Sequence, residues 1–404
     1  MLLRSLAVAA LAGAGCAPAP PLGARRARRG LAAVRAHRFA ATDASRYVSL
    51  LRVPEDWAAF AGEHWLVLKN GSWPSATRAA SLVAFRGCDA RLRTRVGTDC
   101  MQRGTIVARG AWQLHNYALL FDGSSLWGVT GETSAKHAST LRLSATRYGD
   151  QQWLRGAGGL SMDHPGCVER RAGYANKCLY DGRFSLATLG NRTWLYARGN
   201  TNPRGGGRAV FVARREDDTW GRLDPIEFLP GAREPFDLLQ SQKTDVYYGA
   251  VAANPAHPST LLGLFPAASR DRAAIVAAVS CDGLHFSAPV EIWRSAHDRG
   301  EIVDHVVDGV AVDGADALLY VHAGVPGTLR RTCEAQAAAW RPPPSELIQL
   351  RWPLAKLRGF AREGQAALRL RNMCVLEVEV EVEPVPITLT HSTFYTENRA
   401  ICFA

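Results

Sequence analysis

The chain has 404 residues and a formal net charge of +11, and 47% of its residues are hydrophobic. That apolar share is enough for a large ordered core. Seven arginines and no acidic residue occupy positions 1–42, so the remainder carries only 11 − 7 = +4. Because the body is nearly neutral and has no motif that reads DNA or RNA, nucleic acid is excluded as the expected partner.

Residues 1–42 are predicted to be a targeting segment. Arg4 precedes the apolar run Leu6–Leu11, and small residues follow at 13–19, where a signal peptidase would cut. Residues 21–41 are rich in arginine and free of acids, as in an organelle transit peptide. We expect a secretory or extracellular location; the alternative is a plastid or mitochondrion reached through a bipartite or transit leader.

No later stretch approaches the roughly 18 to 20 apolar residues that span a bilayer. We therefore expect no transmembrane span in the mature protein. The sequence does not define an oligomeric state.

Two short patterns recur along the chain. The first is a turn that leads into an aromatic strand, at Asp122–Trp127, Gly190–Tyr196 and Gly314–Tyr320. The second is a strand, an acidic turn and an aromatic residue, at Leu141–Trp153, Ala209–Trp220 and Ile275–Phe286. The closing aromatics of the second pattern are 220 − 153 = 67 and 286 − 220 = 66 residues apart. A fixed period indicates a repeat architecture, and strands at hairpin spacing inside it predict the four-stranded blades of a β-propeller.

In chain order, the pattern predicts an all-β, five-bladed β-propeller over residues 46–358. Its blades are expected at 46 to about 110, 115 to about 154, 178–229, 246–293 and 305 to about 354. Residues 359–404 are predicted to be a short C-terminal β-hairpin extension. Within it, Val375–Glu383 alternates apolar residues with glutamates, which is typical of a half-buried strand with a solvated acidic face.

The cysteines and sequons are consistent with an oxidising compartment. Cys88 with Cys100, and Cys167 with Cys178, bracket short segments and are expected to form local disulfides. Cys374 and Cys402 would tie the tail, while Cys281 and Cys333 are expected to be buried free thiols. Glycosylation sequons begin at Asn70 and Asn191, and Asn191 lies at a predicted hairpin tip.

The chemistry of a propeller is expected where inner strands converge, because their first residues meet from different blades. Polar residues stand at these positions and in the adjoining loops. Those expected to bind substrate are His115, Asn116, Arg183, Arg198, Asn200, Tyr247 and His305.

Three carboxylates are predicted to be catalytic. Asp181 and Asp308 begin inner strands of non-adjacent blades, so they would face one another across the pocket, and Glu169 would deliver a proton from a loop. Two carboxyl groups in this arrangement suit glycosidic-bond cleavage, since one protonates the leaving oxygen and the other activates water or attacks. The alternative is structural, because Asp-Gly at the start of a strand is also a common turn or bulge element.

Other site chemistries fit the sequence less well. It contains no Cys-x-x-Cys pair and no His-Glu-x-x-His motif for zinc, and no Gly-x-Ser-x-Gly nucleophile elbow. Gly205-Gly206-Gly207 lacks the Lys-Ser/Thr of a phosphate loop. We therefore predict no metal and no cofactor.

Four segments resemble the five-bladed propeller glycoside hydrolases, the superfamily of arabinanases, levansucrases and invertases. They are His115–Leu119, Tyr180–Leu186, Leu195–Asn200 and Ser280–Ser287. The resemblance spans about residues 46–355. It implies a propeller that handles an oligosaccharide or polysaccharide in its central pocket, most directly as a glycoside hydrolase.

The sequence departs from that family at its catalytic triad. Blade one has no Asn-Asp-Pro motif, blade two has His115-Asn116 in place of an aspartate, and blade three offers Asp181 with Glu169 upstream. The resemblance therefore leaves two interpretations open. Either the carboxylates are redistributed in an active hydrolase, or the chain is a non-catalytic glycan-binding or scaffold propeller.

Overall fold

The strands of this protein form five sheets that follow one another along the chain. The structure is a computed structural model. It describes residues 26–27, 31–38, 46–55, 61–70, 81–94, 96, 99–102, 104–109, 116–122, 125–131, 137–144, 154–161, 183–200, 208–216, 219–230, 245–268, 273–295, 304–325 and 345–374. The chain divides into two units, 1–374 and 375–404, and all described residues belong to the first.

The first two sheets are antiparallel meanders of four strands each. The first consists of β3 (Arg46–Arg52), β4 (His64–Asn70), β5 (Ser81–Cys88) and β6 (Gly104–Arg109), with a short 3-10 turn, η2 (Cys100–Gln102), before β6. The second consists of β7 (Asn116–Asp122), β8 (Ser125–Gly131), β9 (His137–Ser144) and β10 (Leu154–Ser161). Short connections between neighbouring strands produce this simple order.

The third and fourth sheets carry additional short strands. The third consists of β11 (Phe184–Leu189), β12 (Arg192–Asn200), β13 (Arg208–Glu216), β14 (Thr219–Trp220) and β15 (Asp224–Pro225). The fourth consists of β17 (Asp245–Val246), β18 (Ala250–Ala253), β19 (Leu261–Ala268), β20 (Ala273–Ser280), β21 (His285–Phe286) and β22 (Val290–Arg294), joined by β16 (Glu227–Phe228) and β1 (Arg26–Ala27).

The fifth sheet joins the two ends of the described chain. It consists of β23 (His305–Val306), β24 (Ala311–Asp313), β25 (Asp316–Ala323), β26 (Glu346–Pro353) and β2 (Ala32–Arg38). The predicted blade limits match the five sheets to within a few residues, apart from the added strands β1, β2 and β16 and the later end of β10.

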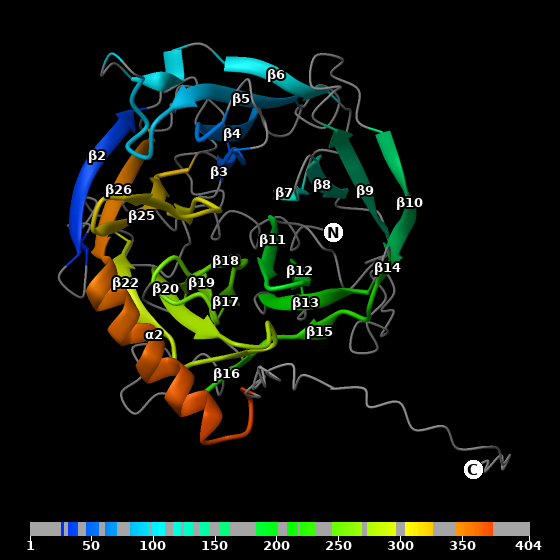
Figure 1. Cartoon of the computed structure of the whole chain (residues 1–404), viewed down its shortest axis with the longest axis vertical. Coiled ribbons are helices and arrows are strands. Elements are labelled where there is room, and N and C mark those ends of the chain that lie inside the picture. Colours follow the sequence, from blue (N-terminus) through cyan, green and yellow to red (C-terminus); the bar gives the residue numbers. More distant parts are fainter. Residues whose placement is uncertain are drawn as a thin grey trace, which may run out of the picture. The chain divides into compact units, whose positions relative to one another are not determined.

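The five sheets contact one another in a closed circuit. Strands of successive sheets near the centre are neighbours: β3 contacts β7, β7 contacts β11, and β11 contacts β18, while β19, the partner of β18, contacts β23. A bridge between Ser49 and Asp308 joins the fifth sheet back to the first. The sheets therefore surround a common centre, with β3, β7, β11 and β18 near it (Figure 1). This arrangement confirms the prediction of an all-β propeller.

The hydrophobic core lies between neighbouring sheets. Trp194 and Tyr196 of the third sheet pack with Phe265 and Phe286 of the fourth, and Tyr196 contacts Phe286 edge to face at 6.2 Å between ring centroids. Leu50 of the first sheet shares a cluster with Leu318 and Tyr320 of the fifth. The third sheet thus packs against the fourth and the fifth against the first, as stacked blades must.

Strand β2 extends the fold into the predicted targeting segment. It pairs with β26 along its length, from Ala32 opposite Arg351 to Arg38 opposite Glu346. Arg35 forms an ion pair with Glu346 at 3.0 Å, and His37 Nδ1 lies 2.5 Å from Asp99 Oδ2. β2 is an edge strand of the fifth sheet. Basic side chains on an edge strand also disfavour pairing with a strand of another molecule. A leader that ends at residue 42 would remove this strand from the sheet.

The predicted β-hairpin at 359–404 is wrong in its first part, because α2 (Leu354–Arg369) is a helix. Leu357, Ala361, Gly364 and Leu368 are buried at helical spacing and pack toward β20 and β26. Buried residues three and four positions apart indicate a helix, whereas a half-buried strand would bury every second residue. The rest of the predicted extension, including Val375–Glu383, lies outside the described residues. Within the described part of the chain, no helix is long and apolar enough to cross a bilayer.

Two disulfides are present in the described chain. The predicted Cys88–Cys100 bond is confirmed, with its Cα atoms 5.4 Å apart. Cys281 bonds Cys374, so the predictions of a free thiol at Cys281 and of a Cys374–Cys402 pair are wrong. This bond joins positions 93 residues apart, a pairing that local spacing does not indicate. The remaining predicted positions, Cys167, Cys178, Cys333 and Cys402, lie outside the described residues.

The seam between the fifth and first sheets depends on a glycine. The Leu50 amide donates to the Asp308 carbonyl at 2.7 Å, and the Asp308 amide donates to the Val48 carbonyl at 3.1 Å. Gly309, which follows, has φ of +108°, and a Cβ there would fall inside contact distance of the Leu50 carbonyl oxygen. Only glycine permits both this backbone angle and this close approach.

We expect Gly309→Ala to lower the free energy of unfolding by about 3 kcal/mol or more, from the positive φ and the displaced seam together. Gly314→Ala is the matched control, because Gly314 also has positive φ, +58°, but nothing lies within 4 Å of its added Cβ. The control should cost about 1 kcal/mol. Urea unfolding of both variants measures the difference, and equal costs would show that the close approach is unimportant.

Candidate functional site

A buried arginine occupies the junction of the inner strands. Arg183 immediately precedes β11, and its side chain is fully buried. Its Nη1 donates to the Val48 carbonyl at 2.6 Å, and its Nη2 donates to Ser49 Oγ and, at 3.3 Å, to Asp308 Oδ2. Its guanidinium lies 5.5 Å from the centroid of the Tyr117 ring. One side chain of the third sheet therefore contacts the first, second and fifth sheets.

Both carboxylate oxygens of Asp308 are engaged by the protein. Oδ2 pairs with Arg183, and Oδ1 accepts a hydrogen bond from Ser185 Oγ at 2.7 Å. Ser185 Oγ also lies 3.1 Å from the Val251 carbonyl and accepts from the Val251 amide at 2.9 Å, which adds the fourth sheet to the network. Since a buried carboxylate needs such partners, this network satisfies Asp308 internally.

Burial sets the protonation behaviour of this centre. It raises the pKa of Asp308, and the nearby Arg183 and Ser185 oppose that shift only in part. Burial also raises the pKa of Tyr117 to about 12, against the opposing influence of Arg183. Tyr117 therefore keeps its hydroxyl proton at neutral pH and donates it to the Val67 carbonyl at 3.2 Å. Tyr248 makes the equivalent link from the fourth to the fifth sheet, at 2.8 Å to the Val306 carbonyl.

A second group of residues, the aromatic–arginine cluster, is formed by Arg198, Arg208, Tyr247 and His305. The guanidinium carbons of Arg198 and Arg208 each lie 4.8 Å from the centroid of the Tyr247 ring, and the His305 ring lies 5.2 Å from it. These residues come from β12, β13, the segment between β17 and β18, and β23. Three of the predicted substrate-binding residues therefore meet here from three sheets.

The cluster has a buried base and a partly exposed rim. Arg198 and His305 are buried, while Arg208 and Tyr247 are partly exposed. Asp304 fixes the start of the His305 strand, because it accepts hydrogen bonds from Trp293 Nε1 at 2.8 Å and from the Gly324 amide at 2.9 Å. The cluster thus combines nitrogen donors, the group type that binds sugar hydroxyls, with an aromatic ring on a supported framework.

Of the other predicted site residues, Arg183 and Asp308 belong to the buried network, and the side chains of five lie outside what the structure describes. Asp181, Glu169 and His115 lie outside the described residues, and the side chains of Asn116 and Asn200 do too. Arg183 was predicted to bind substrate, but its described donors serve Val48, Ser49 and Asp308. The described residues hold no group of three or more histidine, cysteine or acidic side chains suited to a metal ion.

Ser49 and Ser185 complete the buried network, and neither was among the predicted site residues. Neither serine stands in a recognisable motif; their only signal is a small polar residue inside an otherwise apolar strand. Such a residue needs a buried partner, so each serine marks a place where another sheet approaches.

The Asp-Gly turn at Asp282 is structural in the described chain. Asp282 Oδ1 accepts hydrogen bonds from the Leu284 and His285 amides at 2.9 and 2.8 Å, and Ser280 Oγ accepts from the Gly283 amide at 2.9 Å. The turn's Gly283 carbonyl accepts from Tyr196 of the third sheet at 2.9 Å. The repeated acidic turn therefore joins blades, at least at this position.

Comparison with known proteins gives no family model that matches the chain. No curated protein matches it either. Among solved structures, an α-L-arabinanase of Penicillium chrysogenum has a TM-score of 0.45 at 9% identity, covering 82% of this chain and 99% of that one. The α-L-arabinofuranosidase Arb93A of Fusarium graminearum also has 0.45 at 9%, covering 80% and 98%. The β-xylosidase RS223 has 0.44 at 8%, covering 78% and 94%.

A double-mutant cycle tests whether Arg183 and Asp308 act as one unit. We expect Arg183→Met and Asp308→Asn each to lower the free energy of unfolding by about 3 to 5 kcal/mol, because each leaves a buried polar group without its partner. The double variant should cost clearly less than their sum.

The exposed ion pair of Arg91 with Asp313 is the matched control for this cycle. Its coupling should be far smaller, because solvent screens it. Simple additivity at Arg183 and Asp308, measured by urea unfolding, would contradict a coupled network.

Proposed function

We propose that this protein binds an oligosaccharide at the aromatic–arginine cluster and hydrolyses a glycosidic bond there. The observation that carries the proposal is the convergence of Arg198, Tyr247 and His305, with Arg208, from three separate sheets. Guanidinium and imidazole groups beside a tyrosine form a surface suited to sugar hydroxyls. The resemblance of four sequence segments to propeller glycoside hydrolases supports the same reaction class.

The proposed chemistry uses two carboxyl groups in addition to the cluster. Asp181 is two residues from Arg183, and Glu169 precedes it in the chain. In the proposed reaction, one carboxylic acid protonates the leaving oxygen while the other activates water or attacks the anomeric carbon. Asp308 is the weaker choice for either role, because Arg183 and Ser185 already occupy its two oxygens.

That same observation favours a second candidate function, glycan binding without cleavage. If Asp308 serves only to join the sheets, the centre loses one of its three predicted catalytic carboxylates. The aromatic–arginine cluster would still bind sugar, because its residues do not take part in the Asp308 network that is described.

The first experiment incubates the full chain with a broad panel of oligosaccharides and analyses the products by mass spectrometry. For a hydrolase, we expect cleavage of one linkage class, and Asp181→Asn or Glu169→Gln should lower kcat/KM about 10²-fold or more while the fold is retained. Asp313→Asn, an exposed carboxylate, is the control. Binding without any product would favour the second candidate.

The cluster is tested separately with Arg208→Ala. We expect a loss of oligosaccharide affinity of about tenfold, equivalent to about 1.4 kcal/mol. Arg214→Ala is the matched control, because Arg214 lies on the same strand β13 but is exposed and makes no described contact with Tyr247. Equal behaviour of the two variants would remove the cluster from the binding site.

We also propose that the protein is routed through the secretory pathway, as the apolar run at 6–11 indicates. The Cys88–Cys100 and Cys281–Cys374 disulfides support an oxidising compartment. Because β2 completes the fifth sheet, we expect the mature chain to begin before Leu31. N-terminal sequencing of the protein from its own cells measures this, and a mature chain that begins at residue 43 would contradict it.

A further inference from the structure

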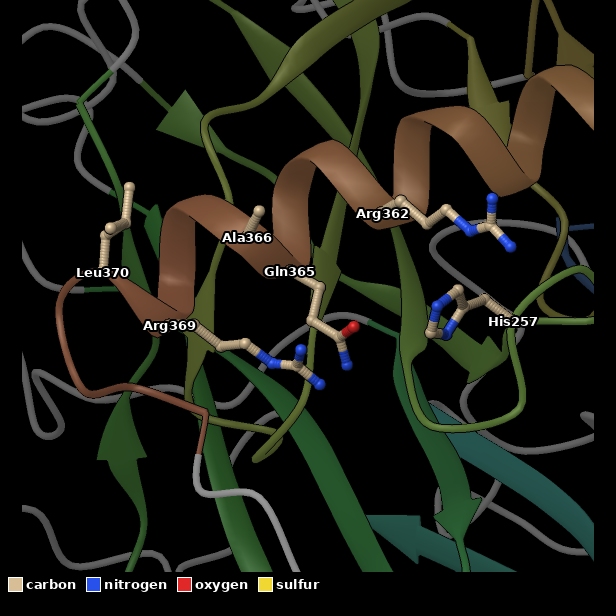
Figure 2. A pocket seen from close by; sticks show the side chains of 6 residues that line it. All are labelled: His257, Arg362, Gln365, Ala366, Arg369 and Leu370. Atoms are coloured by element: carbon tan, nitrogen blue, oxygen red, sulfur yellow. The ribbon is translucent and has the colours of Figure 1, made fainter.

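Helix α2 and the turn between β18 and β19, residues 254–260, enclose a pocket away from the aromatic–arginine cluster. Its volume is about 610 Å³, and it is lined by His257, Arg362, Gln365, Ala366, Arg369 and Leu370. Figure 2 shows Arg362, Gln365 and Arg369 leaving the helix on the side where His257 lies. The lining holds two arginines and a histidine but no carboxylate.

The arrangement follows from the spacing of residues along α2. Arg358, Arg362, Gln365 and Arg369 are four, three and four residues apart, so they form one row on the helix surface. The neighbouring buried stripe fixes the direction of this row. At Gly364 an added Cβ would meet Val279 and Ser287, so the helix lies directly against the fourth sheet and cannot rotate away.

The opposite wall of the pocket is equally well held. Buried Asn254 accepts from the Ala256 amide at 3.0 Å and donates to Thr260 Oγ1 at 3.1 Å, which closes the turn on itself. The helix is joined to the turn by Arg358 Nε, which donates to the Ala256 carbonyl at 3.2 Å. The backbone on this side of the pocket is therefore held by its own hydrogen bonds and by its link to the helix.

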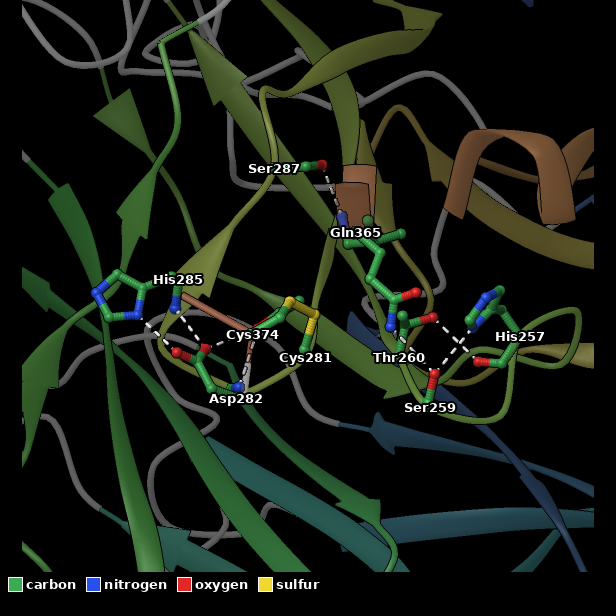
Figure 3. The surroundings of a disulfide bond; sticks show 12 residues. His257, Ser259, Thr260, Cys281, Asp282, His285, Ser287, Gln365 and Cys374 are labelled. Carbon is green, nitrogen blue, oxygen red and sulfur yellow. Dashed lines mark hydrogen bonds and ion pairs between the residues drawn. A yellow bond between two sulfur atoms is a disulfide. The ribbon is translucent and has the colours of Figure 1, made fainter. Parts of the chain in front are cut away.

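A short chain of hydrogen bonds orients the histidine. Gln365 Nε2 donates to Ser259 Oγ at 3.2 Å, and Ser259 Oγ lies 3.2 Å from His257 Nδ1. Figure 3 shows these three side chains together with the Cys281–Cys374 disulfide, which fastens the segment after α2 to the fourth sheet. The ring is thus held at the mouth of an arginine-lined space.

The electrostatics of the pocket lack a negative partner. Burial lowers the pKa of His257, and Arg362, Arg369 and Arg358 lower it further. Among the described residues, no ion pair joins Arg362 or Arg369 to a carboxylate. Glu363, the acidic residue of α2, does not line the pocket. The pocket therefore gathers positive charge with no described carboxylate to balance it, which favours an anionic ligand.

We propose that this pocket is an anion site that binds the tetrahedral oxyanion of a phosphate or sulfate monoester. Two guanidinium groups offer paired N–H donors to such oxygens, a geometry that a lysine ammonium does not provide. Protonated His257 supplies a third positive charge toward the anionic ligand. The site does not depend on the proposed glycosidase chemistry, because it lies on different elements, α2 and the 254–260 turn.

The test uses the full chain and isothermal titration calorimetry with inorganic phosphate, inorganic sulfate, glucose 6-phosphate, glucose 6-sulfate and glucose. We expect the anions to bind and glucose not to bind. Arg362→Gln with Arg369→Gln should weaken binding at least tenfold without changing the thermal unfolding midpoint, since both side chains are exposed. Arg371→Gln is the matched control, an exposed arginine just past the helix that does not line the pocket.

The same series of ligands shows which kind of molecule carries the bound anion. Tighter binding of the sugar phosphate than of phosphate alone assigns the site to a phosphorylated metabolite, and the corresponding result for sulfate assigns it to a sulfated glycan. Failure of every anion to bind, or equal loss in the Arg371→Gln control, would overturn the proposal.

The contribution of His257 is tested by measuring sulfate binding at several pH values. Sulfate is the probe because it does not titrate near neutrality. Binding should be tighter at about pH 5.5 than at about pH 8, since His257 gains its charge as the pH falls and its neighbours Arg358, Arg362 and Arg369 stay charged throughout. His257→Asn should remove this pH dependence. Retention of the full pH dependence in that variant would show that His257 does not contact the anion.

Discussion

The buried guanidinium of Arg183 is the interaction on which the centre of this propeller depends. Five sheets around an axis leave their inner strands with polar backbone groups that face a narrow space, and each needs a partner. Arg183 meets several of these needs at once, because its rigid donors reach Val48 and Ser49 of the first sheet and Asp308 of the fifth. Asp308 then balances the charge that such a donor set introduces.

The same network explains why ring closure is specific. Apolar packing joins neighbouring sheets wherever they stack, and it tolerates small shifts between them. Hydrogen bonds and ion pairs are directional, so the Asp308 bridge to Ser49 defines one register for the last sheet against the first. Gly309 permits that approach, because any side chain there would meet the Leu50 carbonyl. Closure therefore rests on a few polar contacts and one glycine, while the bulk of the stability comes from the cores between sheets.

Much of the fold could be predicted from the sequence, because its strands lie close together in the chain. Hairpins such as Phe184–Leu189 with Arg192–Asn200 are separated by a two-residue turn, and local patterns suffice to find them. The sequence does not indicate strand β2, because its residues are mostly small or basic. Its partner β26 also lies some three hundred residues later in the chain. The Cys281–Cys374 bond and helix α2 were missed for a related reason: a disulfide partner is chosen by the folded structure, and α2 was read together with the alternating segment that follows it.

The site was harder to predict, because one sequence signal has two physical outcomes. A polar residue at the start of an inner strand is equally needed to hold sheets together and to contact a ligand. Arg183 and Asp308 show the first outcome in the described chain, since their partners are protein atoms. Arg198, Tyr247 and His305 occupy comparable positions, yet they gather around one partly exposed ring. The two cases differ in how deeply the side chain is buried and in whether its partners are protein atoms. Residue type and spacing in the sequence predict neither.

The two ends of the described chain meet on the same strand, and this has a consequence for function. The outer edge of β26 pairs with β2, and the chain passes from β26 directly into α2. Just past the end of α2, Cys374 forms a disulfide with Cys281 of the fourth sheet. The helix that carries the arginine row is therefore anchored at both ends, to β26 of the fifth sheet and, through the disulfide, to the fourth sheet. An anion that joins Arg362, Arg369 and His257 would fasten α2 to the fourth sheet next to the fifth. Since ligands that bind only the folded state stabilise it by mass action, occupancy of that pocket would also raise the free energy of unfolding.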